Sequence, residues 1–218
     1  MRPERIILIR HGESEGNADN SLYQTTQDFA LKLSPRGVEQ AKEAGKQIHQ
    51  MIGDGAIYVY LSPYHRTRET YRYISETIGR NVVHIVEDPR LREQDWGHLR
   101  HPDENKGISE ERDLFSTFYY RIPDGESGAD VFDRVSNFMD TLHRDFQKVD
   151  FPQNILIVTH GLTLRLFLMR WFHWTVEEFE SLRNPKNCQI AVMEKQADNH
   201  YRLVTEMEKK QIKRPPSF

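Results

Sequence analysis

Arg10-His11-Gly12-Glu13-Ser14-Glu15-Gly16-Asn17 follows directly on Ile6-Ile7-Leu8-Ile9, and together these residues indicate the architecture of the chain. The apolar run is short and rich in β-branched side chains, which is typical of a strand buried on both faces of an α/β sheet. The residues after it place a guanidinium and an imidazole at the carboxyl end of that strand, the edge where open α/β sheets bind ligands. The two glycines of the stretch allow the backbone to turn closely around a ligand. We therefore expect a binding site at this edge.

A second apolar run ends in the same way. Ile155-Leu156-Ile157-Val158 is followed by Thr159-His160-Gly161, so a second histidine stands at the end of a second buried-type strand. If the two strands are parallel neighbours, their imidazoles emerge at one edge of the sheet.

Two further charged residues are expected at the same edge. Arg66 stands at the start of the helix predicted after a strand at 56–61, and Glu93 follows the strand predicted at 82–86. Both therefore come after the carboxyl ends of strands, from where they can reach the two histidines.

Strands and helices alternate along the chain, which favours a three-layer α/β/α sandwich with a mostly parallel central sheet. We expect residues 1–208 to form a single domain. Residues 89–128 lose regular periodicity but contain several aromatic side chains, so we interpret them as a partly helical insertion that forms a lid over the site. Residues 209–218 are polar and contain proline, which predicts a loose C-terminal tail. The full pattern predicts strands at 6–9, 56–61, 82–86 and 155–158, helices at 35–52, 67–78, 131–146 and 162–172, and a hairpin of 189–193 with 201–205.

Composition excludes several classes of protein. The 218 residues carry a net charge of −3 with 29% charged side chains, so no nucleic-acid partner is expected. Cys188 is the only cysteine, which excludes an intrachain disulfide framework and fits a reducing compartment. The first apolar run is too short for a signal peptide, and no later run is long enough to span a bilayer. We therefore expect a cytoplasmic protein that binds no membrane.

The residues at the predicted edge suit phosphoryl transfer. The transferred group spreads negative charge over three oxygens, so catalysis depends on positioning and electrostatics. Arg10 and Arg66 offer planar forks of N–H donors that match a phosphate, and His160 adds another donor. Nearby cations disfavour the charged form of His11 and keep a ring nitrogen available to attack phosphorus. Glu93 is then the candidate general acid, which protonates the leaving group and later activates water.

These residues also carry a resemblance to a known family, because the chain resembles the histidine phosphatase superfamily, the phosphoglycerate-mutase-like clan. The matching motifs are specific and occur in the family's order. They are Arg10-His11-Gly12-Glu13-Ser14 with Asn17, Leu33-Ser34-Pro35-Arg36-Gly37, Ser62-Pro63 with Arg66 and Thr70, Leu91-Arg92-Glu93 with Trp96-Gly97, and Thr159-His160-Gly161.

The resemblance implies a role for each catalytic residue. His11 would be phosphorylated transiently, Arg10, Arg66 and His160 would hold the phosphoryl group, and Glu93 would donate the proton. Further substrate-binding positions are expected at Asn17, Ser14 and Gly161. The family needs no metal, and the resemblance implies no cofactor. The expected partner is a small-molecule phosphate ester.

Two activities occur in this family. Cofactor-dependent phosphoglycerate mutases carry a longer basic segment with paired arginines after the acid, whereas this chain has mainly acidic residues at 104–113. It also has Tyr23-Gln24-Thr25-Thr26 where mutases have a Gly-Trp turn. The chain therefore looks more like the phosphatases, and we expect a metal-independent, histidine acid-type phosphatase acting on phosphomonoesters. A mutase-type phosphotransferase is the alternative.

Two readings from other classes stay open at this point. His11, His160 and Glu93 are the residue types of a metal site with two histidines and one carboxylate. Arg10 and Arg66 disfavour this reading, because fixed guanidinium groups repel a divalent cation. A non-catalytic phospholigand-binding protein on the same fold is the second alternative, although all five expected catalytic residues are present.

Overall fold

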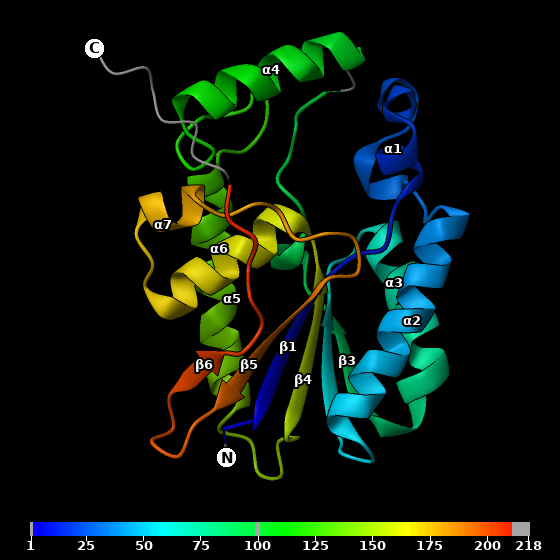
Figure 1. Ribbon diagram of the computed structural model, residues 1–218, viewed down its shortest axis with the longest axis vertical. Coiled ribbons are helices and arrows are strands. Elements are labelled where there is room, and N and C mark those ends of the chain that lie inside the picture. Colours follow the sequence, from blue (N-terminus) through cyan, green and yellow to red (C-terminus); the bar gives the residue numbers. More distant parts are fainter. Residues whose placement is uncertain (1, 99–100, 211–218) are drawn as a thin grey trace.

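A computed structural model describes residues 2–98 and 101–210 of the chain. Its six strands form one mixed sheet in the order β3-β2-β4-β1-β5-β6 (Figure 1). Strands β1 to β4 are mutually parallel, whereas β5 pairs antiparallel with β1 and with β6. The strands are β1 (Arg5–Arg10), β2 (Ile57–Leu61), β3 (Val82–Glu87), β4 (Asn154–Thr159), β5 (Ile190–Lys195) and β6 (Tyr201–Leu203).

Helices cover both faces of this sheet, as the α/β/α expectation requires (Figure 1). Alternate residues of β1 point to opposite faces, so Ile7 and Ile9 pack in one core cluster and Ile6 and Leu8 in the other. The first cluster includes residues of α2 (Pro35–Ile52) and α3 (His65–Ile78), and the second includes residues of α5 (Gly128–Asp145), α6 (Gly161–Phe172) and α7 (Val176–Glu180). The three-layer prediction and the terminal hairpin are confirmed.

Local sequence explains where several of these helices begin. Ser34 accepts a hydrogen bond from Gly37 N at the start of α2, where Pro35 occupies the first turn. Ser127 and Asp130 form a capping box at the start of α5. Because these caps satisfy N–H groups that have no partner inside the helix, each helix starts at a defined residue.

The start of α2 lies directly against the loop that follows β1. A Cβ on Gly12 would lie 2.5 Å from Gly37 O, and a Cβ on Gly37 would lie 2.1 Å from Glu13 O. Both values are far below any real Cβ contact, so these two positions need glycine for the backbones to approach. This contact fixes the loop that carries His11.

The segment between β3 and α5 is partly helical, in agreement with the sequence. It contains the short turn η4 (Pro89–Leu91) and the helix α4 (Pro102–Phe115). Helix α4 lies beyond the carboxyl ends of the parallel strands, at the same end of the sheet as α1 (Glu15–Ala18) (Figure 1).

The first two residues of the predicted C-terminal tail, 209–218, contact the rest of the protein. Lys209 forms a β-bridge with Leu182, and Lys210 N donates to Ser181 O at 2.7 Å. Residues 209 and 210 are therefore attached to the end of α7, and the remainder of the predicted tail, 211–218, lies outside the described residues. Over the described ranges, no helix is long and apolar enough to cross a membrane.

The contact between Gly37 and the loop after β1 predicts a specific effect on stability. Gly37→Ala should lower the free energy of unfolding by about 1–3 kcal/mol, because the added methyl group forces the two backbones apart. Urea denaturation followed by circular dichroism measures this change.

Gly107→Ala is the matched control in α4, where an added Cβ meets no atom within 4 Å. Alanine favours an exposed helix interior over glycine by up to about 1 kcal/mol, so this variant should be at least as stable as the parent. Equal unfolding midpoints for the two variants would contradict the proposed backbone contact.

Candidate active site

The pairing of β1 with β4 brings the two histidines together. Arg10 is in register with Thr159, so the residues that follow, His11 and His160, leave neighbouring parallel strands at the same level. Their ring centroids are 5.2 Å apart with an angle of 62° between the planes. Both side chains are buried, with 3% and 0% exposure.

The hydrogen bonds of His11 define its tautomer. Nδ1 lies 2.7 Å from Gly12 O, which can only accept, so Nδ1 carries the proton. Nε2 therefore has the lone pair, and it accepts a hydrogen bond from Arg66 Nε at 3.2 Å. Burial, followed by the charges of Arg66 and Arg10, lowers the pKa of His11 well below its usual value. The imidazole is thus neutral, with its nucleophilic nitrogen toward the guanidinium.

The His160 ring lies edge-on to the His11 ring, and one of its nitrogens has no hydrogen-bond partner in the described part of the chain. Its Nε2 is 2.7 Å from Ser62 Oγ, and among the described residues its buried Nδ1 has no hydrogen-bond partner. Burial, followed by the charge of Arg66, also lowers the pKa of His160 well below its usual value. If Ser62 donates to Nε2, the proton of His160 is on Nδ1, which is then a donor for a ligand oxygen.

The two arginines are held differently. Arg66 donates to both carboxylate oxygens of Asp28, with Nη1–Oδ1 at 2.9 Å and Nη2–Oδ2 at 3.1 Å. Arg10 donates from Nη1 to Pro185 O at 2.7 Å, while its buried Nε has no partner among the described residues. Burial lowers the pKa of Arg10, whereas Asp28 outweighs the effect of burial on Arg66 and raises its pKa.

Glu93 is held by the residue that follows it and by side chains of α6 and α5. Its Oε1 accepts hydrogen bonds from Gln94 N at 3.1 Å and from Thr163 Oγ1 at 3.2 Å. Arg134 Nη2 donates to the Glu93 carbonyl at 3.0 Å. The carboxylate is therefore fixed on the side of the cavity that faces the arginines.

Arg134 also holds the backbone before Glu93. Its Nη1 donates to the carbonyl oxygens of Arg90 and Arg92 at 2.6 and 2.8 Å. Its charge is balanced by Glu126, whose carboxylate accepts from Nε at 3.1 Å and from Nη2 at 3.0 Å. One buried guanidinium thus fixes the turn that carries the predicted acid.

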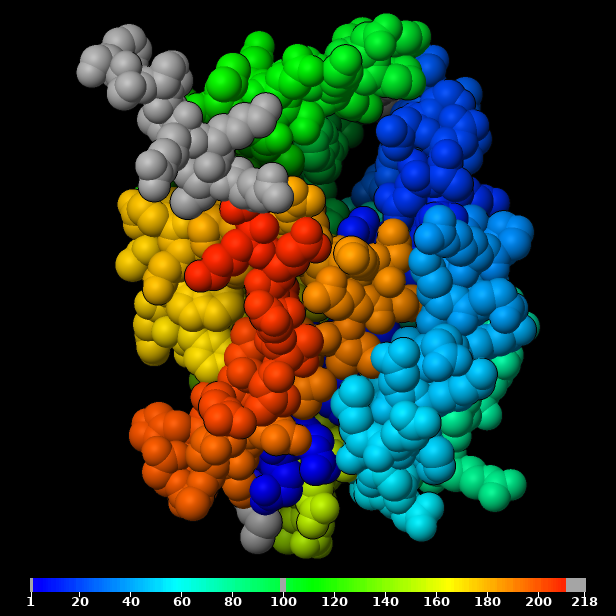
Figure 2. Space-filling model, in the orientation of Figure 1, coloured from blue at the N-terminus to red at the C-terminus, as the bar shows by residue number. Residues whose placement is uncertain are grey.

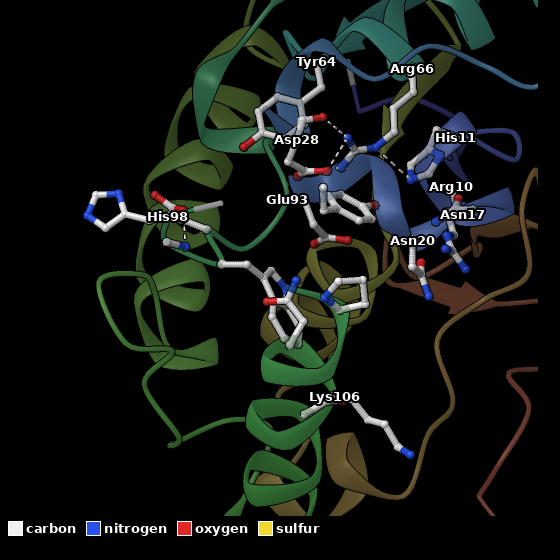
Figure 3. A pocket seen from close by; sticks show the side chains of 17 residues that line it. Arg10, His11, Asn17, Asn20, Asp28, Tyr64, Arg66, Glu93, His98 and Lys106 are labelled. Atoms are coloured by element: carbon white, nitrogen blue, oxygen red, sulfur yellow. Dashed lines mark hydrogen bonds and ion pairs between the residues drawn. The ribbon is translucent and has the colours of Figure 1, made fainter. Parts of the chain in front are cut away.

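These groups meet in one cavity of about 520 Å³, within the size range of small-molecule sites. Figure 2 shows the molecule hollowed between α4 and the residues that follow β1. Figure 3 shows the labelled side chains of Arg66, His11 and Glu93 converging on this space from different elements. The wall consists of Arg10, His11, Asn17, Asn20, Tyr23, Asp28, Tyr64, Arg66, Glu93, Asp95, Trp96, Gly97, His98, Pro102, Asn105, Lys106 and Ser109.

Most of the sequence-predicted site residues line this cavity, but three do not. His160 is fully buried beside His11. Ser14 is buried and caps α1, since its Oγ accepts from Asn17 N at 3.1 Å. Gly161 is the first residue of α6, and an added Cβ there would meet Asn184 at 3.1 Å. In the structure the Ser14 hydroxyl caps α1, and its contact with substrate stays a prediction.

Several residues that line the cavity, and one that supports it, were not predicted. Tyr23 and Tyr64 are aromatic, and burial raises the pKa of each to about 12. Asp28 lies in the short turn η2 (Asp28–Ala30), and no sequence motif marks it. Arg134 is one of several charged residues on the amphipathic helix α5. The partners of these two residues are far away in sequence, so local patterns give no signal for them.

The arrangement bears on the metal alternative. Within residues 2–98 and 101–210, no group of three or more His, Cys, Asp or Glu side chains is arranged to hold a metal ion. The Nε2 lone pair of His11, which a metal would need, already accepts a hydrogen bond from Arg66. The geometry favours an anion between the imidazole and the guanidinium groups.

Comparisons with known proteins indicate one family for this chain. The family model of the histidine phosphatase superfamily (branch 1) matches residues 6–206. Phosphoglycerate mutase-like protein AT74 of Arabidopsis thaliana is 44% identical over 93% of this chain and 68% of its own length.

A fungal relative and a solved structure extend this similarity. Broad-range acid phosphatase DET1 of Saccharomyces cerevisiae is 30% identical over 95% of this chain and 90% of its own length. The crystal structure of a putative α-ribazole-5'-P phosphatase from Escherichia coli superposes with a TM-score of 0.73 at 22% identity, covering 95% of this chain and 97% of that one. The last similarity concerns the fold.

The environment of His11 predicts its protonation at the ordinary histidine pKa of about 6.5. We expect a neutral imidazole with the proton on Nδ1 at this pH and above, because burial and two guanidinium groups disfavour the cation. Nitrogen chemical shifts of ¹⁵N-histidine-labelled protein, with His11→Asn for assignment, measure the tautomer directly. A transition to imidazolium near pH 6.5 in the folded protein would contradict this description.

The same shift has a consequence for stability. The folded-state pKa of His11 lies below the unfolded value of about 6.5, so acidification favours the unfolded chain, which binds the extra proton. The contribution of neutral His11 to the free energy of unfolding is therefore complete above the unfolded-state pKa, and it is lost as the pH falls below that pKa. In His11→Asn the stability should fall less steeply over this interval.

Proposed function

The chain belongs to the histidine phosphatase superfamily (branch 1), and on this premise we propose that it is a phosphatase that hydrolyses phosphomonoesters through a phosphohistidine at His11. The observation that carries the proposal is the neutral Nε2 of His11, which meets a guanidinium at the cavity wall. Glu93 lies on the same wall and provides the acid.

In the first step, His11 Nε2 attacks phosphorus and the bond to the ester oxygen breaks. Glu93 transfers a proton to that oxygen, so an alcohol leaves and the carboxylate remains. Negative charge on the three phosphoryl oxygens is stabilised by N–H donors of Arg10, Arg66 and His160. The unpartnered Arg10 Nε and His160 Nδ1 support this role, because each is a buried polar atom that a phosphoryl oxygen would satisfy.

In the second step, water attacks the phosphohistidine. Glu93 accepts a proton from the water, the water oxygen bonds to phosphorus, and the bond between phosphorus and His11 Nε2 breaks. Inorganic phosphate leaves, and His11 is neutral again. Both steps use only side chains of this chain, so the proposed reaction needs no metal and no cofactor.

Hydrolysis is favoured over mutase activity by the leaving-group side of the cavity. A mutase must hold a second anionic group of its substrate there, and this requires basic side chains. Among the described residues of the 89–128 segment that line the cavity, Lys106 is the only lysine or arginine. Its side chain is 75% exposed and lies beside Glu110. The relative described as a broad-range acid phosphatase gives further support.

The substrate side of the proposal is a small phosphate ester whose alcohol lies beneath α4. Tyr23, Tyr64 and Trp96 give this part of the cavity apolar surface, which suits an organic leaving group. We propose that the 89–128 segment acts as the lid over it, and that the protein acts in the cytoplasm, where its single cysteine fits a reducing environment.

Glu93→Gln separates the two steps and tests the mechanism. With p-nitrophenyl phosphate, whose leaving group needs no proton, we expect a burst of about one equivalent of nitrophenol followed by slow turnover. Phosphate should be found on His11 by mass spectrometry after an alkaline quench. With glycerol 2-phosphate, whose alkoxide leaving group needs the proton, no burst of glycerol should appear.

His11→Ala is the control, and it should give neither burst nor phosphoprotein. A burst with label elsewhere, or undiminished turnover of His11→Ala, would contradict the covalent mechanism. Full activity of the parent enzyme in excess EDTA supports metal independence. Conversion of 3-phosphoglycerate into 2-phosphoglycerate faster than phosphate release would assign the chain to the mutases instead.

A further inference from the structure

The carboxylate of Asp28 uses one edge of the Arg66 guanidinium. A guanidinium has five N–H donors in a fixed planar arrangement. Both hydrogens on Nη1 bond to Asp28, one to Oδ1 at 2.9 Å and one to the backbone oxygen at 2.6 Å. One hydrogen on Nη2 bonds to Oδ2 at 3.1 Å. Asp28 therefore accepts three of the five donors, two from Nη1 and one from Nη2.

The opposite edge faces His11. Arg66 Nε donates to His11 Nε2 at 3.2 Å, and the second Nη2 hydrogen lies on the same side of the guanidinium as the Nε–H. Figure 3 shows this order, with Asp28 on one side of Arg66 and His11 on the other. The Nε and Nη2 edge is a two-donor fork that matches two oxygens of one phosphoryl group.

We propose that Asp28 is a positioning residue, which fixes Arg66 so that its Nε and Nη2 edge faces the phosphoryl group formed on His11. This inference rests on the proposed function, because it concerns the step in which phosphorus bonds to Nε2. When that bond forms, the lone pair is used and the Nε–H is released to an oxygen on phosphorus. The fork is then in place without movement of the arginine.

The surroundings of the pair keep it rigid. The Arg66 side chain is 4% exposed, and its guanidinium lies 4.9 Å from the centroid of the Tyr64 ring. The segment of Asp28 is attached to the same helix by a second contact, since Glu69 Oε2 accepts from Leu33 N at 2.7 Å. Asp28 thus approaches Arg66 from a segment that α3 itself holds.

A blocking role for Asp28 is the competing view, because its carboxylate is an anion next to the site. It is disfavoured by the edge that the carboxylate occupies. A phosphoryl group on His11 Nε2 meets the Nε and Nη2 edge, while Asp28 takes the Nη1 and Nη2 end. The two anions therefore use different donors, and neither has to displace the other.

Asp28→Ala and Asp28→Asn test this assignment. In Asp28→Ala we expect kcat/KM for p-nitrophenyl phosphate to fall by about 30-fold and the Ki of orthovanadate, which mimics the transferred group, to rise by a similar factor. Asp28→Asn keeps one side-chain acceptor and the backbone oxygen, so it should lose less than about 10-fold in both quantities. This graded pattern in inhibitor binding would not follow from loss of stability alone.

A double-mutant cycle tests whether Asp28 acts through Arg66. In an Arg66→Ala background, Asp28→Ala should lower kcat/KM by less than about 2-fold, because there is no guanidinium left to position. Glu87→Ala is the matched control, since Glu87 pairs with Arg68 of the same helix by two bonds, Nε–Oε1 at 2.8 Å and Nη2–Oε2 at 2.5 Å. Its activity and vanadate affinity should equal those of the parent.

The outcomes separate this inference from the proposed function. Tighter vanadate binding in Asp28→Asn would show a blocking carboxylate and overturn the assignment. An equal loss from Asp28→Ala with and without Arg66 would overturn it as well. If Arg66→Ala itself keeps full activity, the phosphoryl-binding role of Arg66 in the proposed function fails first.

Discussion

The in-register parallel pairing of β1 with β4 is the constraint on which the site depends. Because Arg10 lies opposite Thr159, two residues separated by most of the chain continue from neighbouring strands as His11 and His160. A shift of one residue in this register would turn every side chain of the strand to the opposite face. Side chains on the two faces pack in two separate core clusters, so such a shift would require both clusters to repack, and the core therefore fixes the spacing of the imidazoles.

Burial and charge then act together on these imidazoles. Desolvation and the adjacent guanidinium groups both disfavour imidazolium, so a positively charged region contains neutral imidazoles. The positive charge of that region is itself held by other parts of the fold: Asp28 binds Arg66, and Pro185 accepts from Arg10. An anion in the cavity therefore meets donors that are already oriented.

The sequence predicted the layers, the paired strands and the residues at their ends, because apolar runs and capping residues are local signals. Arg10, His11, Arg66 and Glu93 follow from such signals and from the family resemblance, and they line one cavity. The contacts of Asp28 and Arg134 were not predictable, since each bonds to groups far away in sequence. The hydroxyl of Ser14, predicted to bind substrate, caps α1 in the structure, as short polar side chains at helix starts commonly do.

A crystal structure with orthovanadate bound would show which atoms of the cavity hold the transferred group. We expect vanadium bonded to Nε2 of His11, with its equatorial oxygens accepting hydrogen bonds from Arg10, from the Nε and Nη2 edge of Arg66 and from Nδ1 of His160. Vanadate bound elsewhere in the cavity, or bonded to neither imidazole, would contradict it.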